Sequence, residues 1–428
     1  MGVVRKRIPI DQLECGMRIV DLDRSWLETP FWRHRMRVAG ASDIERLKAC
    51  GVRFVEVELE ERTDRASKPS EVDELEGTMD NLTEPPVSAE SLVRPASGDA
   101  ETPVEVTTTD ARSFEEELPA ARETYQAAKR IIRDTMHEAR LGRDINLEAV
   151  NRVVSALVDS LFRHADALTS LTRLKRFDEY TFYHSVNTAI LALALGRRLH
   201  LNATALHRLG VGTLLHDIGK MRIPPEILNK PGRLNADEFE LMKQHALRGA
   251  EFLAETTGLD DTSVKPALEH HERVDGSGYP FGRKRAELSA FGIIAAVVDM
   301  YDALTSDRCY HKAKPPHEVL RFLYLLGRRG QLHFGLVHRF IKVVGIYPVG
   351  SCVALNTGEI AVVSRLNHQQ PLLPTVFIVK DSGGRQVVKP EPLDLTTQTT
   401  KPLRVVETVL NPTHVGVDPD LVLDGGEQ

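Results

Sequence analysis

Between residues 214 and 280 the chain concentrates side chains that commonly bind transition metals. Four histidines lie in this stretch, and one histidine before it and one aspartate after it extend the series. Seven side chains form a plausible ligand set: His184, His216, Asp217, His245, His270, His271 and Asp299. Imidazole and carboxylate together suit iron, manganese, zinc, nickel or cobalt better than magnesium or calcium, which prefer all-oxygen ligands.

The number of candidate ligands favours two metal ions over one. An aspartate can bridge two cations with its two oxygens, whereas a four-coordinate structural zinc needs no such bridge. Two adjacent cations suit a phosphodiester substrate, because they neutralise its non-bridging oxygens and lower the pKa of a shared water. The prediction depends on the whole set, because a single histidine on an apolar helix, such as His184, is more often a buried structural residue.

Two basic side chains near the candidate ligands could hold phosphate groups. Lys220 lies about one helical turn after Asp217, and Arg308 lies nine residues beyond the last candidate ligand. Each has a structural alternative: Lys220 as an exposed lysine, and Arg308 as the ion-pair partner of Asp302 or Asp307.

A glycine-rich turn follows the histidine pair. Residues 275–280 read DGSGYP, which predicts a tight turn with Tyr279 projecting from it and with the φ angle of Pro280 fixed. By itself such a turn could be an ordinary surface loop.

These side chains need a helical scaffold, and the apolar pattern predicts one. From about Glu116, apolar residues recur three or four positions apart, and this period continues with breaks to about Ile341. No sustained β alternation interrupts it. We therefore predict a mainly α protein, with an all-helical domain at residues 116–345.

The segments before this domain differ from it and from each other. Residues 1–60 predict a small α/β module, with short strands at 7–10, 17–20 and 52–59 and a helix at 42–50. Trp26 and Trp32 lie here, as an aromatic core or as a binding surface. Residues 61–115 are rich in Ser, Thr, Pro and acidic residues, which predicts a disordered acidic linker.

After residue 345 the period changes again. Strands are predicted at 351–355, 359–363, 374–380 and 386–388, separated by turn residues, so residues 346–410 predict a small antiparallel β unit. Residues 411–428 predict a loose tail.

Composition excludes several classes of function. The 428 residues carry a formal net charge of −6, which gives no indication of nucleic-acid binding. The longest apolar run, around residues 189–195, is too short to span a bilayer, and no apolar segment follows the basic N-terminus. The four cysteines are far apart and predict free thiols. We expect a cytoplasmic protein without a membrane span.

The order of the motifs resembles the HD-GYP branch of the HD phosphohydrolases, which hydrolyse the bacterial second messenger cyclic di-GMP. The resemblance covers about residues 184–341. It includes HDIGK at 216–220, His245 with Gly249, HHERVDGSGYP at 270–280, and the stretch from Asp299 to Arg308. Residues 1–60 resemble the small domain of unknown function that often precedes HD-GYP domains.

The resemblance implies a role for each candidate residue. The seven candidate ligands would bind two metal ions, usually iron or manganese, with Asp217 bridging them, and Asp217 and Lys220 would be catalytic. Lys220 and Arg308 would contact the phosphates of cyclic di-GMP. Gly278, Tyr279 and Pro280 would shape the substrate site and, in some members, dock GGDEF-domain proteins.

This chain departs from the family pattern at three places. Some members hold a third metal with a glutamate where this chain has Tyr180, so we predict a binuclear site. The residues after Arg308 are Cys309, Tyr310 and His311 instead of the common Pro-Tyr-Lys/Arg, which leaves both pGpG and GMP open as final products. The stretch 330–334 also lacks the Phe-Asp-Pro of many members.

The sequence thus predicts a metal-dependent cyclic di-GMP phosphodiesterase in bacterial signal transduction. Two alternatives stay open: a non-catalytic cyclic di-GMP receptor or scaffold, and a hydrolase of another cyclic dinucleotide. The complete ligand set favours an enzyme over a receptor, because a receptor without activity has less need of all seven ligands.

Overall fold

The structure is a computed structural model of the whole chain. It describes residues 4–14, 17–22, 36–38, 44–45, 47–48, 52–59, 112–173, 180–230, 232–306, 313–399 and 401–425. The chain divides into two compact units, residues 1–83 and 84–428. Trp26, Trp32, Arg308 and nearly all of the predicted linker lie outside the described residues.

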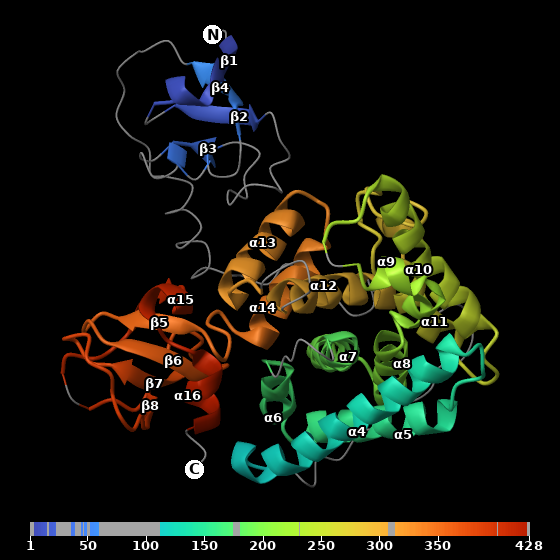
Figure 1. The fold of residues 1–428 in the computed structure, drawn as a ribbon. Coiled ribbons are helices and arrows are strands. Elements are labelled where there is room, and N and C mark those ends of the chain that lie inside the picture. Colours follow the sequence, from blue (N-terminus) through green and yellow to red (C-terminus); the bar gives the residue numbers. More distant parts are fainter. Residues whose placement is uncertain are drawn as a thin grey trace. The chain divides into compact units, whose positions relative to one another are not determined.

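The N-terminal unit contains a four-stranded antiparallel sheet (Figure 1). Its order is β1 (Val4–Pro9), β4 (Phe54–Leu59), β2 (Arg18–Leu22) and β3 (Met36–Arg37), and a 3-10 turn, η1 (Ile10–Gln12), follows β1. Ile8, Ile19, Val55 and Val57 form its core together with Leu47, and on β4 the valines alternate with glutamates. Of the helix predicted at 42–50, residues 44, 45, 47 and 48 are described, and they are helical.

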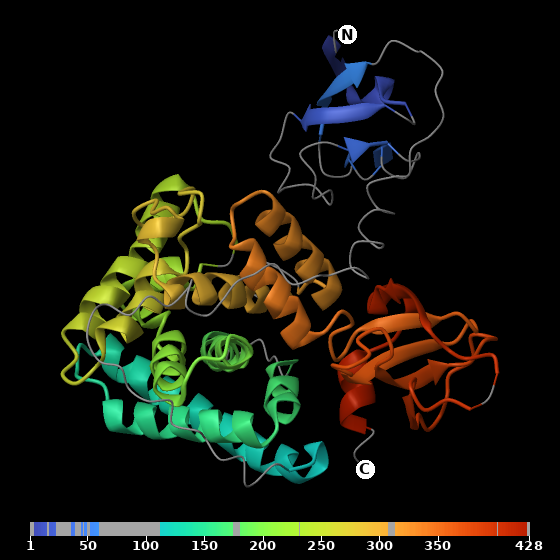
Figure 2. The same ribbon diagram turned by 180° about the vertical axis from the view of Figure 1, so that it is seen from behind.

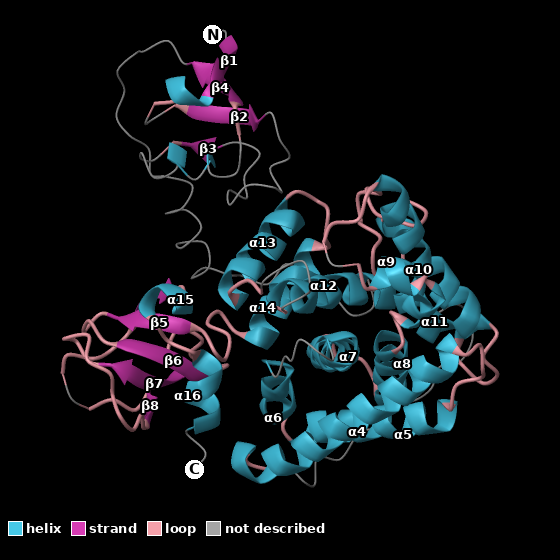
Figure 3. Ribbon diagram, in the orientation of Figure 1, coloured by secondary structure: helices cyan, strands magenta, loops and turns pink. Residues whose placement is uncertain are grey.

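The second unit begins with a body of helices, drawn in cyan in Figure 3. In chain order the longer helices are α4 (Phe114–Arg140), α5 (Leu147–Arg163), α6 (Ala165–Ser170), α7 (Tyr180–Arg198), α8 (Ala203–Leu214), α10 (Ala236–Ala254), α11 (Asp261–Glu269), α12 (Ala290–Thr305), α13 (Pro316–Arg328) and α14 (Phe334–Val344). Short turns lie between them: η3 (Leu171–Arg173), η5 (Ile218–Arg222), α9 (Pro225–Leu228) and η6 (Arg285–Glu287). The prediction of a mainly helical fold is confirmed.

Helix α7 is the centre of this body. Seen along its axis in Figures 1 and 2, it lies between α12 on one side and α4 and α5 on the other. Val186, Ala189, Ile190 and Leu193 of α7 are completely or almost completely buried, because other helices pack around α7. A polar side chain on α7 therefore points into protein and needs a partner there.

A buried ion pair fixes α4 to the body. The helix starts two residues earlier than predicted, where Ser113 and Glu116 form a capping box. The carboxylate of Glu117 is buried and accepts hydrogen bonds from Arg163 Nε at 2.7 Å and Ser160 Oγ at 2.8 Å, both on α5. Since removing one partner of a buried ion pair leaves an uncompensated charge, this contact sets the position of α4.

The β unit is a five-stranded antiparallel sheet in the order β8, β7, β6, β5, β9. The strands are β5 (Cys352–Leu355), β6 (Ile360–Arg365), β7 (Thr375–Lys380), β8 (Pro392–Asp394) and β9 (Val406–Leu410). The strand predicted at 386–388 is wrong: Gln386 makes a single bridge to Lys380, and Val388 is almost fully exposed. Cys352, the one cysteine in the described part of the chain, is buried and free.

The loose tail predicted after residue 410 is wrong for residues 411–425. This segment forms two short helices, α15 (Pro412–Val415) and α16 (Pro419–Gly425). Leu423 is buried against Val362 of β6 and Val379 of β7. Burial of this leucine offsets part of the entropy cost of ordering the segment.

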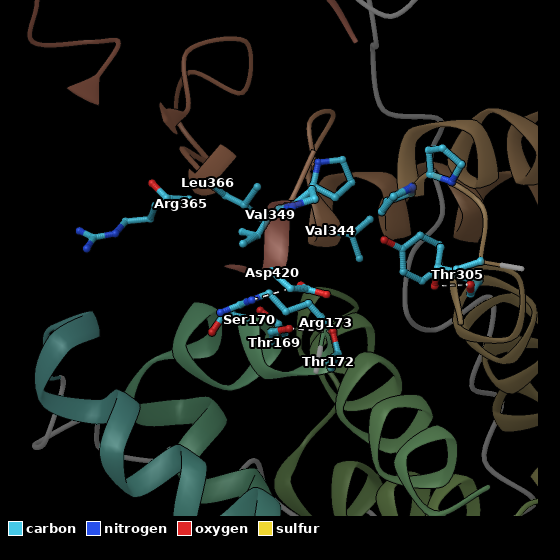
Figure 4. A pocket seen from close by; sticks show the side chains of 18 of the residues that line it. Thr169, Ser170, Thr172, Arg173, Thr305, Val344, Val349, Arg365, Leu366 and Asp420 are labelled. Atoms are coloured by element: carbon cyan, nitrogen blue, oxygen red, sulfur yellow. Dashed lines mark hydrogen bonds and ion pairs between the residues drawn. The ribbon is translucent and has the colours of Figure 1, made fainter. Parts of the chain in front are cut away.

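The β unit and the helices meet around a cavity of about 340 Å³ (Figure 4). Thr169, Ser170 and Arg173 line it from the helical side, and Arg365 and Asp420 from the β side. Arg173 and Asp420, which both line this cavity, form an ion pair of 3.4 Å across the junction. Within the described residues, no helix is both long and apolar enough to cross a membrane.

Candidate metal centre

The helical body brings the seven candidate ligands together. His184 comes from α7, His216 and Asp217 from the turn between α8 and η5, and His245 from α10. His270 and His271 directly follow α11, and Asp299 lies on α12. All are buried except His271, which is partly exposed. Seven polar side chains from five elements thus converge inside an otherwise apolar body.

Asp217 occupies the middle of the cluster. Its Oδ2 lies 3.5 Å from Nε2 of His184 and 3.4 Å from Nε2 of His216. Its Oδ1 lies 3.5 Å from Nε2 of His245 and 3.7 Å from Nε2 of His270. Each carboxylate oxygen therefore faces a separate pair of imidazoles, which is the arrangement that a carboxylate bridging two cations requires.

Two groups of potential ligands flank this aspartate. In the first, Asp299 Oδ1 lies 3.0 Å from Nε2 of His184 and 3.8 Å from Nε2 of His216. The second group consists of the three imidazoles of His245, His270 and His271. Within each group the potential ligand atoms lie within 4.8 Å of one another. These clusters could hold metal ions.

Hydrogen bonds behind the imidazoles decide which nitrogen faces the centre. Nδ1 of His216 donates to the carbonyl of Thr213 at 2.7 Å, and Nδ1 of His245 donates to the carbonyl of Met242 at 2.7 Å. Nδ1 of His270 is 2.8 Å from the carbonyl of its own helix, at residue 266. Each Nε2 therefore carries a lone pair and points inward, as metal-binding histidines do.

The cluster has the features of a site that needs cations. Nε2 of His216 and Oδ1 of Asp217 are buried and find no hydrogen-bond donor among the described residues. Nε2 of His245 and Nε2 of His270 face each other at 3.2 Å, and both carry lone pairs. A cation between such atoms removes their repulsion and satisfies them, so the residues fit a metal centre.

The protonation states also suit metal binding. Burial lowers the pKa of His245 to about 4 and that of His270 to about 3, so both imidazoles are neutral near pH 7. Burial alone would raise the pKa of Asp217, but the positive charge of Lys220 beside it holds this pKa well below its usual range. Neutral imidazoles and an ionised carboxylate are the forms that bind metals.

The turn that carries His216 and Asp217 is held by a close backbone approach. Gly219 of η5 faces Gly249 of α10 with no room for a side chain between them. This contact brings the HD dipeptide next to His245, one turn before Gly249 on the same helix face.

The predicted phosphate contacts have different outcomes. Lys220 lies at the edge of the cluster, where its Nζ donates to Oδ2 of Asp217 and its side chain is largely buried, unlike the exposed lysine of the alternative. Arg308 lies outside the described residues. Of the two predicted phosphate contacts, the structure therefore places only Lys220, beside the Asp217 carboxylate.

The glycine-rich loop covers the side of the cluster formed by His271. The Tyr279 ring stacks on the His271 ring, with centroids 4.5 Å apart and an interplanar angle of 26°. Gly278 lies so close to the backbone of Glu272 that a Cβ atom on residue 278 would stand 2.4 Å from the Cα of Glu272, which leaves no room for a side chain. The buried carboxylate of Glu272 accepts from the backbone N–H groups of Phe281 at 2.8 Å and Arg283 at 3.0 Å.

Three polar residues behind the cluster were not predicted as part of the site. Asp302 Oδ2 lies 2.8 Å from Nδ1 of His184, and Asp302 Oδ1 accepts from Nδ2 of Asn187 at 3.1 Å. Asn187 Oδ1 accepts from the hydroxyl of Tyr125 at 2.7 Å. Asp302 and Asn187 each lie three positions after a candidate ligand, a helical spacing that could have identified them. No comparable signal marks Tyr125.

Comparison with known protein families accounts for most of the chain. A family model described as an HD domain matches residues 155–334. A domain of unknown function, DUF3391, matches residues 5–150, and a KOW domain associated with HD domains matches residues 352–414.

Several curated proteins are similar to this chain. A protein of Pseudomonas aeruginosa named as a cyclic di-GMP phosphodiesterase is 35% identical over 391 residues, or 91% of this chain and 89% of the relative. A cyclic di-GMP phosphodiesterase of Thermotoga maritima is 36% identical over 187 residues, or 43% of this chain and 50% of the relative. A 3′3′-cGAMP-specific phosphodiesterase of Vibrio cholerae is 37% identical over 145 residues, or 34% of this chain and 33% of the relative. This chain therefore belongs to the HD-domain phosphodiesterase family, and it joins the HD domain to a DUF3391 segment and a KOW domain.

Proposed function

We propose that the chain is an HD-GYP phosphodiesterase that hydrolyses cyclic di-GMP. The observation that carries the proposal is the position of Asp217, whose two oxygens each face a separate pair of imidazole Nε2 atoms. A receptor without activity would not need this arrangement, because its affinity for a dinucleotide could come from phosphate and base contacts alone.

The ligand sets divide between two divalent ions, for which we propose iron or manganese. His184, His216 and Asp299 would hold one ion, and His245, His270 and His271 the other, with Asp217 between them. When bound, such ions supply Lewis-acid stabilisation of a phosphodiester and a water of lowered pKa. The imidazoles of His245 and His270 make this binding available near pH 7, because their lowered pKa values keep them neutral there.

Other residues would position the substrate. Lys220 can leave Oδ2 of Asp217 and donate to a non-bridging phosphate oxygen, since its flexible side chain already reaches the edge of the cluster. Tyr279 can present its ring and hydroxyl beside His271. We assign a second phosphate contact to Arg308 on the resemblance alone. The docking of GGDEF-domain proteins by residues 278–280 and a cytoplasmic location also stay expectations.

The substrate class has a second candidate. The similarity to a 3′3′-cGAMP-specific phosphodiesterase covers 145 residues, whereas the similarity to a cyclic di-GMP phosphodiesterase covers 391. The longer match favours cyclic di-GMP. Both pGpG and GMP remain candidate products, because the residues after Arg308 depart from the family pattern.

The direct experiment measures kcat/KM of metal-replete protein for cyclic di-GMP and for 3′3′-cGAMP, with chromatography of the products. Asp217→Ala should abolish turnover, and Asp237→Ala, an exposed aspartate on α10, should leave it unchanged. Faster cleavage of 3′3′-cGAMP would assign the second substrate. If the metal-replete protein binds cyclic di-GMP but does not cleave it, the protein is a receptor and not an enzyme.

A further inference from the structure

A continuous chain of hydrogen bonds runs from helix α4 to the candidate metal centre. The hydroxyl of Tyr125 donates to Oδ1 of Asn187 at 2.7 Å, and Nδ2 of Asn187 donates to Oδ1 of Asp302 at 3.1 Å. Asp302 Oδ2 lies 2.8 Å from Nδ1 of His184, whose Nε2 faces the centre. All four side chains are almost completely buried.

In this series of hydrogen bonds, each group can act either as donor or as acceptor in only one way. Burial and the negative charge of Asp302 raise the pKa of Tyr125 well above its usual value, so the phenol keeps its proton and donates it. Asn187 must then turn its oxygen towards Tyr125 and its NH₂ group towards Asp302. The second hydrogen of this NH₂ group donates to the carbonyl of Thr172 at 3.1 Å, so the amide is fully satisfied in this orientation.

The orientation of Asn187 matters because of what lies beyond it. A carboxylate behind a metal-binding imidazole fixes the tautomer and the orientation of the ring and raises its basicity. Without the Tyr125 hydroxyl, the buried Oδ1 of Asn187 would lose its donor, and the position of the Asn187 side chain would be less firmly held. A displaced Asn187 would donate less well to Asp302, and the carboxylate would then hold His184 less firmly.

We propose that Tyr125 is a positioning residue for the metal centre, acting on His184 through Asn187 and Asp302. The proposal rests on the proposed function, since it takes His184 to be a metal ligand. It also gives a role to helix α4, which the HD model does not cover: Tyr125 lies in the part of the chain matched by DUF3391, residues 5–150, and the HD model matches residues 155–334. The metal centre would then depend on a residue that precedes the matched HD segment.

The neighbouring Tyr183 provides a matched control. Its ring centroid lies 6.2 Å from that of Tyr125, and it is also buried. Its hydroxyl accepts from Nζ of Lys129 at 3.1 Å. Tyr183→Phe therefore removes the same atom from the same part of the core, without breaking the hydrogen-bond chain to His184.

The test is a titration of the full-length, metal-free protein with Mn²⁺, followed by electron paramagnetic resonance of the free ion. We expect Tyr125→Phe to weaken the binding of one Mn²⁺ by about three- to tenfold, which is less than the roughly 10- to 100-fold typical of residues directly behind metal ligands, because two groups intervene. Tyr183→Phe should bind as the unaltered protein does. In an Asp302→Asn background, Tyr125→Phe should have no further effect.

Three outcomes would overturn the proposal. Unaltered Mn²⁺ affinity in Tyr125→Phe would show that the hydroxyl does not act on the centre. Equal weakening by Tyr125→Phe and Tyr183→Phe would show a general packing effect. Failure of the unaltered protein to bind Mn²⁺ would remove the metal centre itself, whereas the first two outcomes in a protein that still cleaves cyclic di-GMP would reject only the role of Tyr125.

Discussion

Gly219 and Gly249 lie so close that a methyl group on Gly219 would stand 2.5 Å from the backbone nitrogen of Gly249. The same methyl group would stand 2.0 Å from the carbonyl oxygen of His245. Two backbones can approach in this way only where neither residue has a side chain. The contact links the turn that carries His216 and Asp217 to the helix that carries His245.

We therefore predict that Gly219→Ala damages stability and the metal centre together. The added methyl group overlaps backbone atoms that cannot move without moving α10, so we expect the free energy of unfolding to fall by about 2 to 3 kcal/mol. Gly249→Ala should cost less, because its nearest contact would be 3.0 Å. Urea denaturation and Mn²⁺ titration measure both effects. A Gly219→Ala protein with unaltered stability and metal affinity would contradict the close contact.

A second prediction concerns the loop that holds Tyr279. Glu272→Gln leaves one acceptor oxygen for the two backbone N–H groups of Phe281 and Arg283, and hydrogen bonds to a charged group are worth about 1.5 to 3 kcal/mol each. We expect the KM for cyclic di-GMP to rise while the metal content stays the same. Glu287→Gln is the control, because Glu287 is exposed and accepts from Lys284 at the end of the loop. Equal KM values for the two variants would contradict a role for Glu272 in shaping the site.

The candidate ligands could be found from the sequence, because their residue types are unusual within an apolar helical pattern. His216 and Asp217 lie one residue beyond the buried end of α8, and His270 and His271 directly follow α11. What the sequence could not give is which oxygen of Asp217 faces which imidazole. That geometry depends on how α7 and the four other ligand-bearing elements pack together.

The polar residues behind the ligands show why prediction stopped at the cluster. Tyr125 and Asn187 are 62 residues apart and meet because α4 packs against α7. An aromatic residue at helical spacing is usually a core residue, and Tyr125 is one as well.

The strand predicted at 386–388 failed for a similar reason. Val388 has no apolar surface to pack on and remains exposed, so local alternation alone did not form a strand.

Removal of metal should lower the thermal stability of the protein. The centre buries an ionised carboxylate and several lone pairs that cations would satisfy. Bound metal at about a hundred times its Kd stabilises a folded protein by about 2.7 kcal/mol. We expect a chelator to lower the Tm of the metal-replete protein and to leave the Tm of Asp217→Ala unchanged. If the Tm of the protein without substitutions does not change after verified metal removal, the centre is not stabilised by metal.

Lys220 should affect turnover more than metal binding. We expect Lys220→Ala to lower kcat by roughly a hundredfold, the loss typical of removing one preorganised donor from a developing negative charge, and to retain its metal ions. Lys389→Ala, which removes an exposed lysine of the β unit, is the control. Loss of metal together with activity in Lys220→Ala would instead make Lys220 a residue that maintains the centre.

The most direct test of the binuclear phosphodiesterase combines metal quantification and product analysis on anaerobically purified protein. We expect two iron or manganese ions per chain and conversion of cyclic di-GMP to pGpG or GMP, with both lost in Asp217→Ala. A ratio near three ions per chain would contradict the binuclear site that Tyr180 predicts. Bound metal with intact cyclic di-GMP, or full activity in Asp217→Ala, would contradict the proposed function itself.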